Sequence, residues 1–393
     1  MNDAEVKLTL NQVQRYETCK ALIEGRLSLQ EAALALRLSP RQVLRLKRRL
    51  LAEGPQGLIH RNTARPPANC TLPELKQQVL HLATTTYAHF NFCHLADILA
   101  QEHHILLSDE TLRRWLRPQG HGRPPRRRGK HRRRRTRRSR AGELLFLDGS
   151  PHPWFGPSRP SCCLLLASDD ATGKPLWGKF QPEEDRDGCF EVCYQVFVRF
   201  GLPGAFYLDR ASQFITTRVG GRQALHNPER EPTHFEAAMS LLKVGLIFAY
   251  SPQARGRGER LNGTFQDRLV AELAVHKIRT ARRATEYLNS VFIPRYGRRF
   301  GHAPADDRPA WRAVPAGIDL EAVLSAKFTR TVACDHTVRF EGQTYQLLPP
   351  PRCPSLARSE IEVQQRFDGS IHFHHGRHGT IPAKRLPRRG KGG

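Results

Sequence analysis

Three acidic residues stand where the chain is expected to pass from one structural element to the next. Asp148 ends the apolar run Leu144 to Leu147, Asp209 ends the run Ala205 to Leu208, and Glu259 opens an amphipathic helix. Carboxylates brought together from separate elements repel one another unless a cation holds them. Two divalent metal ions would do so, and paired metal ions support phosphoryl transfer. The pattern therefore predicts a metal-dependent site that acts on a phosphate.

The charge of the chain indicates what carries that phosphate. Its 393 residues include 63 Lys and Arg against 37 Asp and Glu, which gives a formal net charge of +26. Arginine predominates over lysine, and its guanidinium group binds phosphate through two parallel hydrogen bonds. A polyanionic partner, a nucleic acid, is favoured over an acidic protein partner.

Several classes of protein are disfavoured by the composition. No apolar run approaches the length of a membrane span, and the N-terminus lacks the apolar core of a signal peptide, so we expect a soluble cytoplasmic protein. We expect no membrane partner and no small-molecule substrate. The nine cysteines contain no CxxC pair, which favours buried reduced thiols over a zinc site.

Residues 1–60 are predicted to form a helix-turn-helix DNA-binding domain. Ser28 and Glu31 make a capping box for its second helix, and Ser39-Pro40 supplies the cap and first residue of a basic third helix. Such a pair reads the major groove; the alternative is a solvated basic helix in an ordinary bundle. The DNA-binding candidates here are Arg41, Gln42, Arg45 and Arg48.

Residues 68–118 are predicted to form a second helical DNA-binding domain. Its last helix starts at Ser108 and presents Arg113 and Arg114; a plain helical bundle is the alternative. A basic linker over 119–141 follows, in which Arg127, Arg133 and Arg134 are expected to track the DNA backbone.

Residues 142–300 alternate strand-like and helix-like patterns, which predicts an α/β layer fold. The strands are expected at 144–147, 162–167, 176–180, 205–208 and 246–250, and Leu261, Phe265, Leu269 and Leu273 mark the core side of the last helix. A Pro-rich linker over 301–328 should lead to a small SH3-like β-barrel over 329–386 and a basic tail over 387–393.

Four segments carry a resemblance to a known family: LDGSPHPWFG, LLLASDDATGK, FYLDRASQF and YSPQARGRGERLNGTFQDRLVAEL. The chain resembles the DDE integrase-core transposases of bacterial insertion sequences, in particular those with an ISNCY- or IS481-like layout. The spacing of about fifty residues between Asp209 and Glu259 is longer than in retroviral integrases, and an inserted surface loop around 220–232 would account for it.

The resemblance implies a fold, a reaction and partners. The fold is an RNase H-like integrase catalytic core with N-terminal helix-turn-helix domains and a C-terminal small β-barrel. Asp148, Asp209 and Glu259 would hold two Mg²⁺ or Mn²⁺ ions. The protein would bind double-stranded DNA, both the terminal inverted repeats of its element and a target DNA, cleave the 3′ ends and catalyse strand transfer. It would act as a homo-oligomer associated with the bacterial nucleoid.

Alternatives remain open on the sequence. Asp169 and Asp170 could replace the first aspartates but favour a hairpin turn, and Glu236 could replace the third ligand. Arg255, Arg257 and Arg260 around Glu259 could hold the DNA backbone or pair with nearby acids. A non-catalytic DNA-binding regulator and an RNase H-like nuclease without joining activity are the rival functions.

Overall fold

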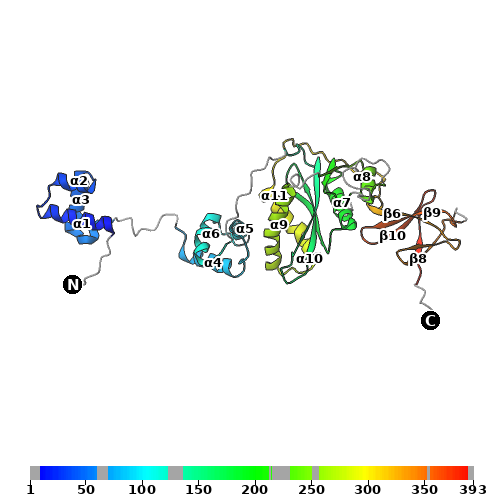
Figure 1. The fold of residues 1–393 in the computed structure, drawn as a ribbon, viewed down its shortest axis with the longest axis horizontal. Helices are drawn as coiled ribbons and strands as arrows, with labels where there is room; N and C mark the ends of the chain where they lie inside the picture. Colours follow the sequence, from blue (N-terminus) through cyan, green and yellow to red (C-terminus); the bar gives the residue numbers. More distant parts are fainter. Residues whose placement is uncertain are drawn as a thin grey trace. The chain divides into compact units, whose positions relative to one another are not determined.

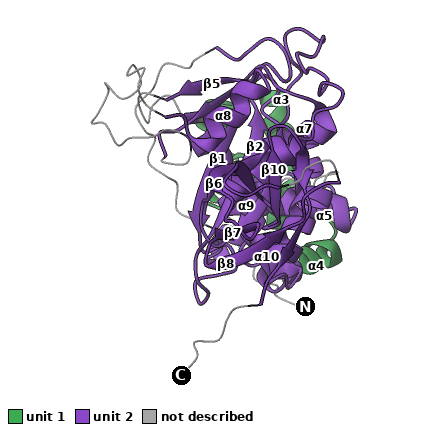
Figure 2. Cartoon of the chain, turned by 90° about the vertical axis from the view of Figure 1, so that its right-hand side faces the viewer, with its two compact units in different colours: residues 1–79 green, residues 80–393 purple. Residues whose placement is uncertain are grey.

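The chain divides into two compact units, Met1–Val79 and Leu80–Gly393 (Figure 2). In the computed structural model, the described residues are 9–59, 70–122, 136–211, 214, 231–249, 256–351 and 355–387.

Over residues 9–59, the first unit contains three helices that start at well-defined caps. They are α1 (Leu10–Ile23), α2 (Leu29–Leu36) and α3 (Pro40–Glu53), followed by the 3-10 turn η1 (Gly54–Leu58). The Ser28 hydroxyl accepts a hydrogen bond from the Glu31 backbone N–H, and the Glu31 carboxylate accepts one from the Ser28 N–H. Ser39 and Gln42 repeat this exchange at α3. Both predicted capping sites are confirmed.

The three helices bury their apolar sides against one another. Val43 of α3 packs with Ala32 and Ala33 of α2, and Leu50 of α3 packs with Cys19 of α1. The turn between α2 and α3 passes through Arg37, whose φ of 54° lies in the left-handed region. This burial leaves the other face of α3, which carries most of its arginines, exposed to solvent.

The boundary between the units falls within α4 (Pro73–Thr84), and the second unit continues with two further helices. These are α5 (Phe92–Glu102), capped by Asn91, and α6 (Asp109–Leu116), capped by Ser108 and extended by the turn η2 (Arg117–Gln119). The cap predicted at Ser108 is confirmed, since its hydroxyl accepts from the Thr111 N–H at 3.1 Å. Residues 80–119 therefore supply a compact helical layer.

A five-stranded mixed sheet forms the centre of the second unit. Its strands are β1 (Leu144–His152), β2 (Cys162–Asp169), β3 (Pro175–Gln181), β4 (Ala205–Leu208) and β5 (Gly245–Phe248), in the order β3-β2-β1-β4-β5. The first three strands pair antiparallel, and β4 and β5 run parallel to β1. These are the order and directions of the RNase H-like sheet that the resemblance implies. The predicted α/β core is confirmed.

Helices cover both faces of this sheet (Figure 1). Alternate residues of a strand point to opposite faces, so Leu164 and Leu166 of β2 enter one core while Leu165 and Ala167 enter the other. The first core includes α9 (Gly256–Val275), α10 (Ala281–Tyr287), the π-helical turn η5 (Leu288–Phe292) and α11 (Ile293–Phe300). The second includes α7 (Arg186–Phe200) and α8 (His234–Leu241).

The predicted end of the first strand, at Asp148, is wrong. Asp148 does not end its strand, because β1 runs on to His152. The reason is pairing: β2 stays bonded to β1 as far as His152 opposite Cys162, although the residues after Leu147 are no longer a simple apolar run. Pro151 is tolerated there because the parallel partner β4 has already ended on its other side.

The Pro-rich segment predicted as a linker is tied to the core. Leu202 and Arg312 exchange two backbone hydrogen bonds of 2.8 and 2.9 Å, and Trp311 stacks on Phe200. Gly142 lies so close to Trp311 that an added Cβ would be 2.5 Å from its ring, and its φ of 82° is unfavourable for other residues. A short helix, α12 (Leu320–Val323), leads into the C-terminal strands.

The C-terminal strands form two open sheets in the described residues, and the predicted small barrel is not confirmed. One sheet has the order β11-β10-β9-β6 and the other β12-β8-β7. Residues of both sheets, such as Val363 and Leu347, share one apolar core. The strands are β6 (Ser325–Thr331), β7 (Thr337–Phe340), β8 (Gln343–Leu347), β9 (Glu360–Arg366), β10 (Ile371–His375), β11 (Gly379–Ile381) and β12 (Ala383–Arg385).

The thiol prediction holds only in part. Cys163, Cys189 and Cys193 are buried and reduced, and burial raises the pKa of each thiol, which keeps it protonated. Cys70, Cys93 and Cys334 are exposed instead. Within the described ranges, no helix combines the length and apolar character needed to cross a membrane.

Candidate active site

Asp148 lies within β1, and Asp209 is the first residue after the end of the neighbouring strand β4. In the parallel pair β1–β4, Phe146 stands opposite Tyr207, and each aspartate follows two residues after its member of that pair. Both aspartates are half-buried. The backbone N–H of Ala211 donates to Asp209 Oδ1 at 3.0 Å, which fixes one side of that carboxylate.

Helix α9 is bonded to β1 by its polar side. Asn262 Nδ2 donates to Asp148 Oδ2 at 2.9 Å, and one turn later Gln266 Nε2 donates to Ser150 Oγ at 3.1 Å. Residues three or four apart share a face of a helix, whereas Phe265, Leu269 and Leu273 of the other face are buried. The predicted division of α9 into an apolar and a polar side is confirmed.

The N-terminus of α9 reaches Asp148 through a glycine. An added Cβ on Gly258 would lie 3.3 Å from Asp148 Oδ2, so the absence of a side chain permits the close approach. Glu259 follows Gly258 in the first turn, one turn before Asn262, and its side chain is exposed. A carboxylate in this turn is favoured by the partial positive charge of the helix N-terminus.

The donor atoms suit a hard divalent cation, but the three carboxylates are not collected into one cluster. Carboxylate oxygens are the ligands that Mg²⁺ prefers, and Asp148 of β1 and Asp209, next to the end of β4, each carry them. Among the described residues, however, no group of three or more His, Cys, Asp or Glu side chains is arranged to hold a metal ion.

The rival carboxylates have structural roles. Asp169 is 2% exposed and accepts hydrogen bonds from the N–H groups of Gly142 and Thr172 and from the Thr172 hydroxyl. Asp170, 1% exposed, accepts from the Arg138 N–H. The two residues shape the turn from β2 to β3, as predicted. Glu236 accepts from the Thr233 N–H in a capping box of α8.

The predicted DNA-binding residues are placed differently in the two helical regions. Arg41, Gln42, Arg45 and Arg48 all have exposed side chains on α3. On α6, Arg114 is exposed, but Arg113 is half-buried and its guanidinium group pairs with Glu110 at 2.5 Å and with Asp109 at 3.9 Å.

The remaining predicted contacts lie around α9 and in the basic linker. Arg260 is exposed in α9, and its Nε donates to the Gly256 carbonyl at 2.9 Å. The side chain of Arg257, together with Arg127, Arg133, Arg134 and Arg255, lies outside the described residues.

A polar cluster between α5 and the two helices α9 and α11 escaped prediction. His94 and Glu272, 178 residues apart, join through a 2.8 Å contact with side chains only 1% and 6% exposed. The available signal was weak: Arg268 and Glu272 place charges four residues apart beside the apolar stripe of α9. Such a pattern is ordinarily that of a solvated helix face.

Sequence relatives share nearly the whole chain. A helix-turn-helix domain is recognised over residues 14–67. The chain is 32% identical over 367 residues to y4bF of Sinorhizobium fredii, a protein named as a transposase; the match covers 93% of this chain and 79% of y4bF. It is 28% identical over 402 residues to the transposase for insertion sequence IS1202 of Streptococcus pneumoniae, covering 93% and 84%.

Solved structures with similarity to this chain include retroviral integrases. The catalytic core domain of HTLV-2 integrase, in complex with magnesium, matches 39% of this chain and 89% of its own at 14% identity and a TM-score of 0.28. The simian T-cell lymphotropic virus intasome in complex with a PP2A regulatory subunit matches 79% and 100% at 11% identity and a TM-score of 0.32. On the sequence relatives alone, the chain belongs to the family of insertion-sequence transposases.

Proposed function

We propose that this transposase binds the ends of its insertion sequence, cleaves them to leave 3′-hydroxyl groups and joins those ends to a target DNA. Asp148, Asp209 and Glu259 are proposed as the ligands of two Mg²⁺ or Mn²⁺ ions. The observation that carries the proposal is the parallel pairing of β1, which contains Asp148, with β4, which Asp209 directly follows, together with the hydrogen bond from Asn262 of α9 to Asp148.

The reaction is proposed to proceed by two in-line displacements at phosphorus. Water attacks the phosphodiester at the element end, a new P–O bond forms, and the bond from phosphorus to the 3′ oxygen breaks. The released 3′-hydroxyl then attacks a target phosphodiester, which exchanges one P–O bond for another and needs no external energy. Two metal ions bound at such a site activate the attacking oxygen and stabilise the leaving one.

The residues of this chain contribute orientation and charge. Asn262 donates a 2.9 Å hydrogen bond to Oδ2 of Asp148 and would orient this carboxylate as a ligand. Asp209 is held by the Ala211 N–H. Glu259, exposed beside Gly258 in the first turn of α9, would supply the third carboxylate ligand. Arg260 is proposed to hold the DNA backbone next to the scissile phosphate.

The helical regions carry residues that are proposed to bind DNA. We propose that exposed residues of α3 read the terminal repeats in the major groove, since α2 and α3 form a capped helix-turn-helix pair. Arg114 of α6 and the basic linker would contact phosphates and add affinity without selectivity. Because two element ends must be processed together, the active form is proposed to be a homo-oligomer.

A cleavage-and-joining assay on DNA carrying the element ends tests the proposal. With Mg²⁺ or Mn²⁺ the wild type should nick the 3′ ends and join them to a target, whereas Asp148→Asn, Asp209→Asn and Glu259→Gln should bind DNA but do neither. Asp307→Asn, at an exposed acid in the 301–328 segment, is the matched control and should stay active. Specific binding without any cleavage would favour a DNA-binding regulator, and cleavage without joining would favour a nuclease.

A further inference from the structure

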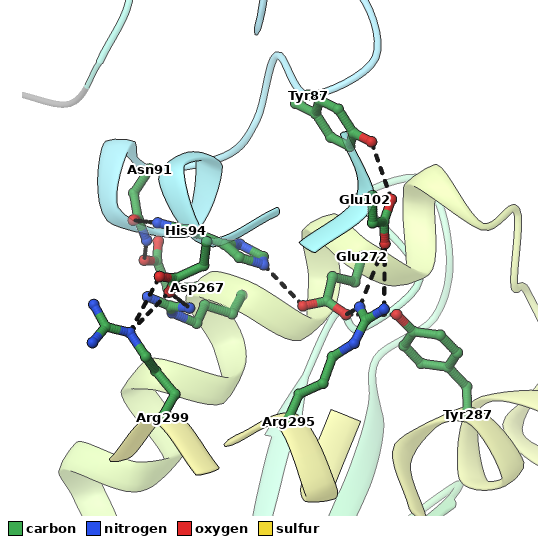
Figure 3. Close-up of polar contacts among 11 residues, drawn as sticks. Tyr87, Asn91, His94, Glu102, Asp267, Glu272, Tyr287, Arg295 and Arg299 are labelled. Carbon is green, nitrogen blue, oxygen red and sulfur yellow. Dashed lines mark hydrogen bonds and ion pairs between the residues drawn. The ribbon is translucent and has the colours of Figure 1, made fainter. Parts of the chain in front are cut away.

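Helix α5 is fastened to α9 and α11 by a set of polar contacts that the proposed function does not use (Figure 3). His94 contacts Glu272, Asp97 accepts a 2.8 Å hydrogen bond from Arg268 and pairs with Arg299 at 3.2 Å, and Glu102 pairs with Arg295 at 3.4 Å. Asn91, which caps α5, also donates to Asp267. We call the contacts of His94, Asp97 and Glu102 with α9 and α11 the α5 clasp.

The centre of the clasp is a neutral imidazole that donates to a carboxylate. Burial lowers the pKa of His94, and the opposing effect of Glu272 does not overcome it. Burial alone would raise the pKa of Glu272, but hydrogen bonds from His94 and Tyr287 and the charge of Arg295 lower it overall. Because His94 Nδ1 is buried without a hydrogen-bond partner among the described residues, the proton is assigned to Nε2, which donates to Glu272.

Glu272 also contacts two residues that lie outside α5, Tyr287 and Arg295. The Tyr287 hydroxyl donates to it at 2.5 Å, and Arg295 lies 3.9 Å away. Glu102, which pairs with Arg295, also accepts from the Tyr87 hydroxyl at 3.2 Å. The carboxylates and guanidinium groups therefore alternate across the interface, and each charge meets an opposite one. A hydrogen-bonded network of this kind permits one relative orientation of the helices, which an apolar contact of equal area would not specify.

The place of the clasp along α9 connects it to the proposed active site. Glu272 is thirteen residues after Glu259, or roughly 20 Å of helix. The N-terminal half of α9 is bonded to β1 through Asn262 and Gln266, and its C-terminal half is bonded to α5 by the clasp. Helix α6 packs against α5 and carries Arg114. Through α5 and the clasp, α6 is therefore connected to α9, the helix that carries Glu259.

Resting on the proposed function, we propose that His94 and Glu272 are positioning residues that set where bound DNA is cut. DNA held on α6 is kept at a fixed distance from the first turn of α9, so that one particular phosphodiester reaches Asp148, Asp209 and Glu259. Buried ion pairs often contribute less to stability than apolar contacts of similar size, and in some proteins they specify a single geometry instead.

Three variants test this proposal by the position and the rate of cleavage on end DNA. His94→Ala removes the donor to Glu272, and kcat should fall by about ten- to a hundred-fold, with cuts spread over neighbouring phosphodiesters and DNA affinity unchanged. His94→Gln supplies an amide N–H and should restore both rate and position. Arg282→Ala, at an exposed pair with Glu286 on α10, is the control and should behave as the wild type.

The possible results separate the two proposals. Cleavage by His94→Ala at the wild-type rate and at the wild-type phosphodiester would refute the proposed positioning role of the clasp. If this variant does not fold, Tyr287→Phe, which removes only the hydroxyl that donates to Glu272, decides in its place by the same two measurements. An inert wild type would instead refute the proposed function. Amide hydrogen exchange over 92–102 then tests the clasp. Exchange should be faster in His94→Ala than in the wild type if the contact between His94 and Glu272 stabilises α5.

Discussion

Asn262 Nδ2 lies 2.9 Å from Asp148 Oδ2, so a hydrogen bond joins the second turn of α9 to the middle of β1. The two residues are 114 positions apart in the chain, and this bond holds one oxygen of the carboxylate. A hydrogen bond to a charged group contributes about 1.5–3 kcal/mol and fixes direction as well as energy. Asn262 is therefore a positioning residue for the proposed site.

Replacement of Asn262 tests this orientation. Asn262→Ala should lower kcat for end cleavage by about ten- to a hundred-fold, because the carboxylate loses the donor that fixes it. Asn262→Asp should be at least as damaging, since it sets a like charge against Asp148. DNA affinity should stay unchanged in both. Single-turnover cleavage combined with a binding titration measures the two quantities separately, and a wild-type kcat in Asn262→Ala would contradict the role.

Two glycines of α9 offer a matched pair for a second prediction. Gly258→Ala brings a methyl group to 3.3 Å from Asp148 Oδ2, so the carboxylate must shift by a few tenths of an ångström and kcat should fall. Gly263→Ala meets nothing within 4 Å and sits on an exposed position of the same helix. It should keep full activity and stabilise the helix by up to about 1 kcal/mol. Equal kcat values for the two variants, measured together with thermal unfolding, would rule out the close approach as a functional constraint.

The elements that were predicted well are those encoded over short distances. The caps at Ser28, Ser39 and Ser108 and the apolar stripe of α9 depend on residues three or four apart. These signals act within one element, so the sequence contains all that is needed to interpret them.

What could not be predicted depends on pairing between distant segments. The extension of β1 past Asp148 follows from continued bonding to β2, which no local pattern announces. The burial of His94 with Glu272 arises because α5 lies on α9, and a charged residue beside an apolar stripe ordinarily indicates a solvated face. The open C-terminal sheets likewise depend on which strands pair, since alternation alone does not distinguish a closed barrel from two sheets.

The exposed arginines of α3 lead to a prediction about salt. Removing one side chain that binds a phosphate should reduce the slope of log affinity against log salt concentration by about 0.9. Arg45→Ala and Arg48→Ala should weaken DNA binding. If the replaced residue contacts a phosphate, the slope of log affinity against log salt concentration should become less steep by the same amount on specific and on unrelated DNA. A residue that reads a base should cost about 1–3 kcal/mol on the terminal repeat alone.

Arg26 is the matched control for this series. It is exposed in the same unit, but it lies in the turn before α2 and pairs with Glu24. Arg26→Ala should leave both the affinity and its salt dependence unchanged. If neither α3 variant differs from Arg26→Ala in a titration at several salt concentrations, α3 is not the helix that contacts DNA.

The α5 clasp predicts that the second unit loses stability on acidification. The folded-state pKa of His94 is lowered from its ordinary value of 6.5, so the unfolded chain binds the proton more tightly. The contribution of the neutral imidazole is therefore fully present above pH 6.5 and is lost as the pH falls toward the folded pKa. Glu272, whose pKa is lowered from 4.5, adds a further loss at pH values below that.

His94→Gln isolates the histidine contribution, because the amide does not titrate. The groups that face His94 are Glu272 and Arg268 of α9 and Asp97 of α5, and all three remain in this variant. Between about pH 7 and pH 5 the wild type should therefore lose more unfolding free energy than His94→Gln. Other histidines with lowered pKa values, such as His152 and His234, titrate in both proteins and cancel in the difference. Parallel denaturant titrations at each pH give that difference, and a constant value across the range would mean that His94 is not buried in its neutral form.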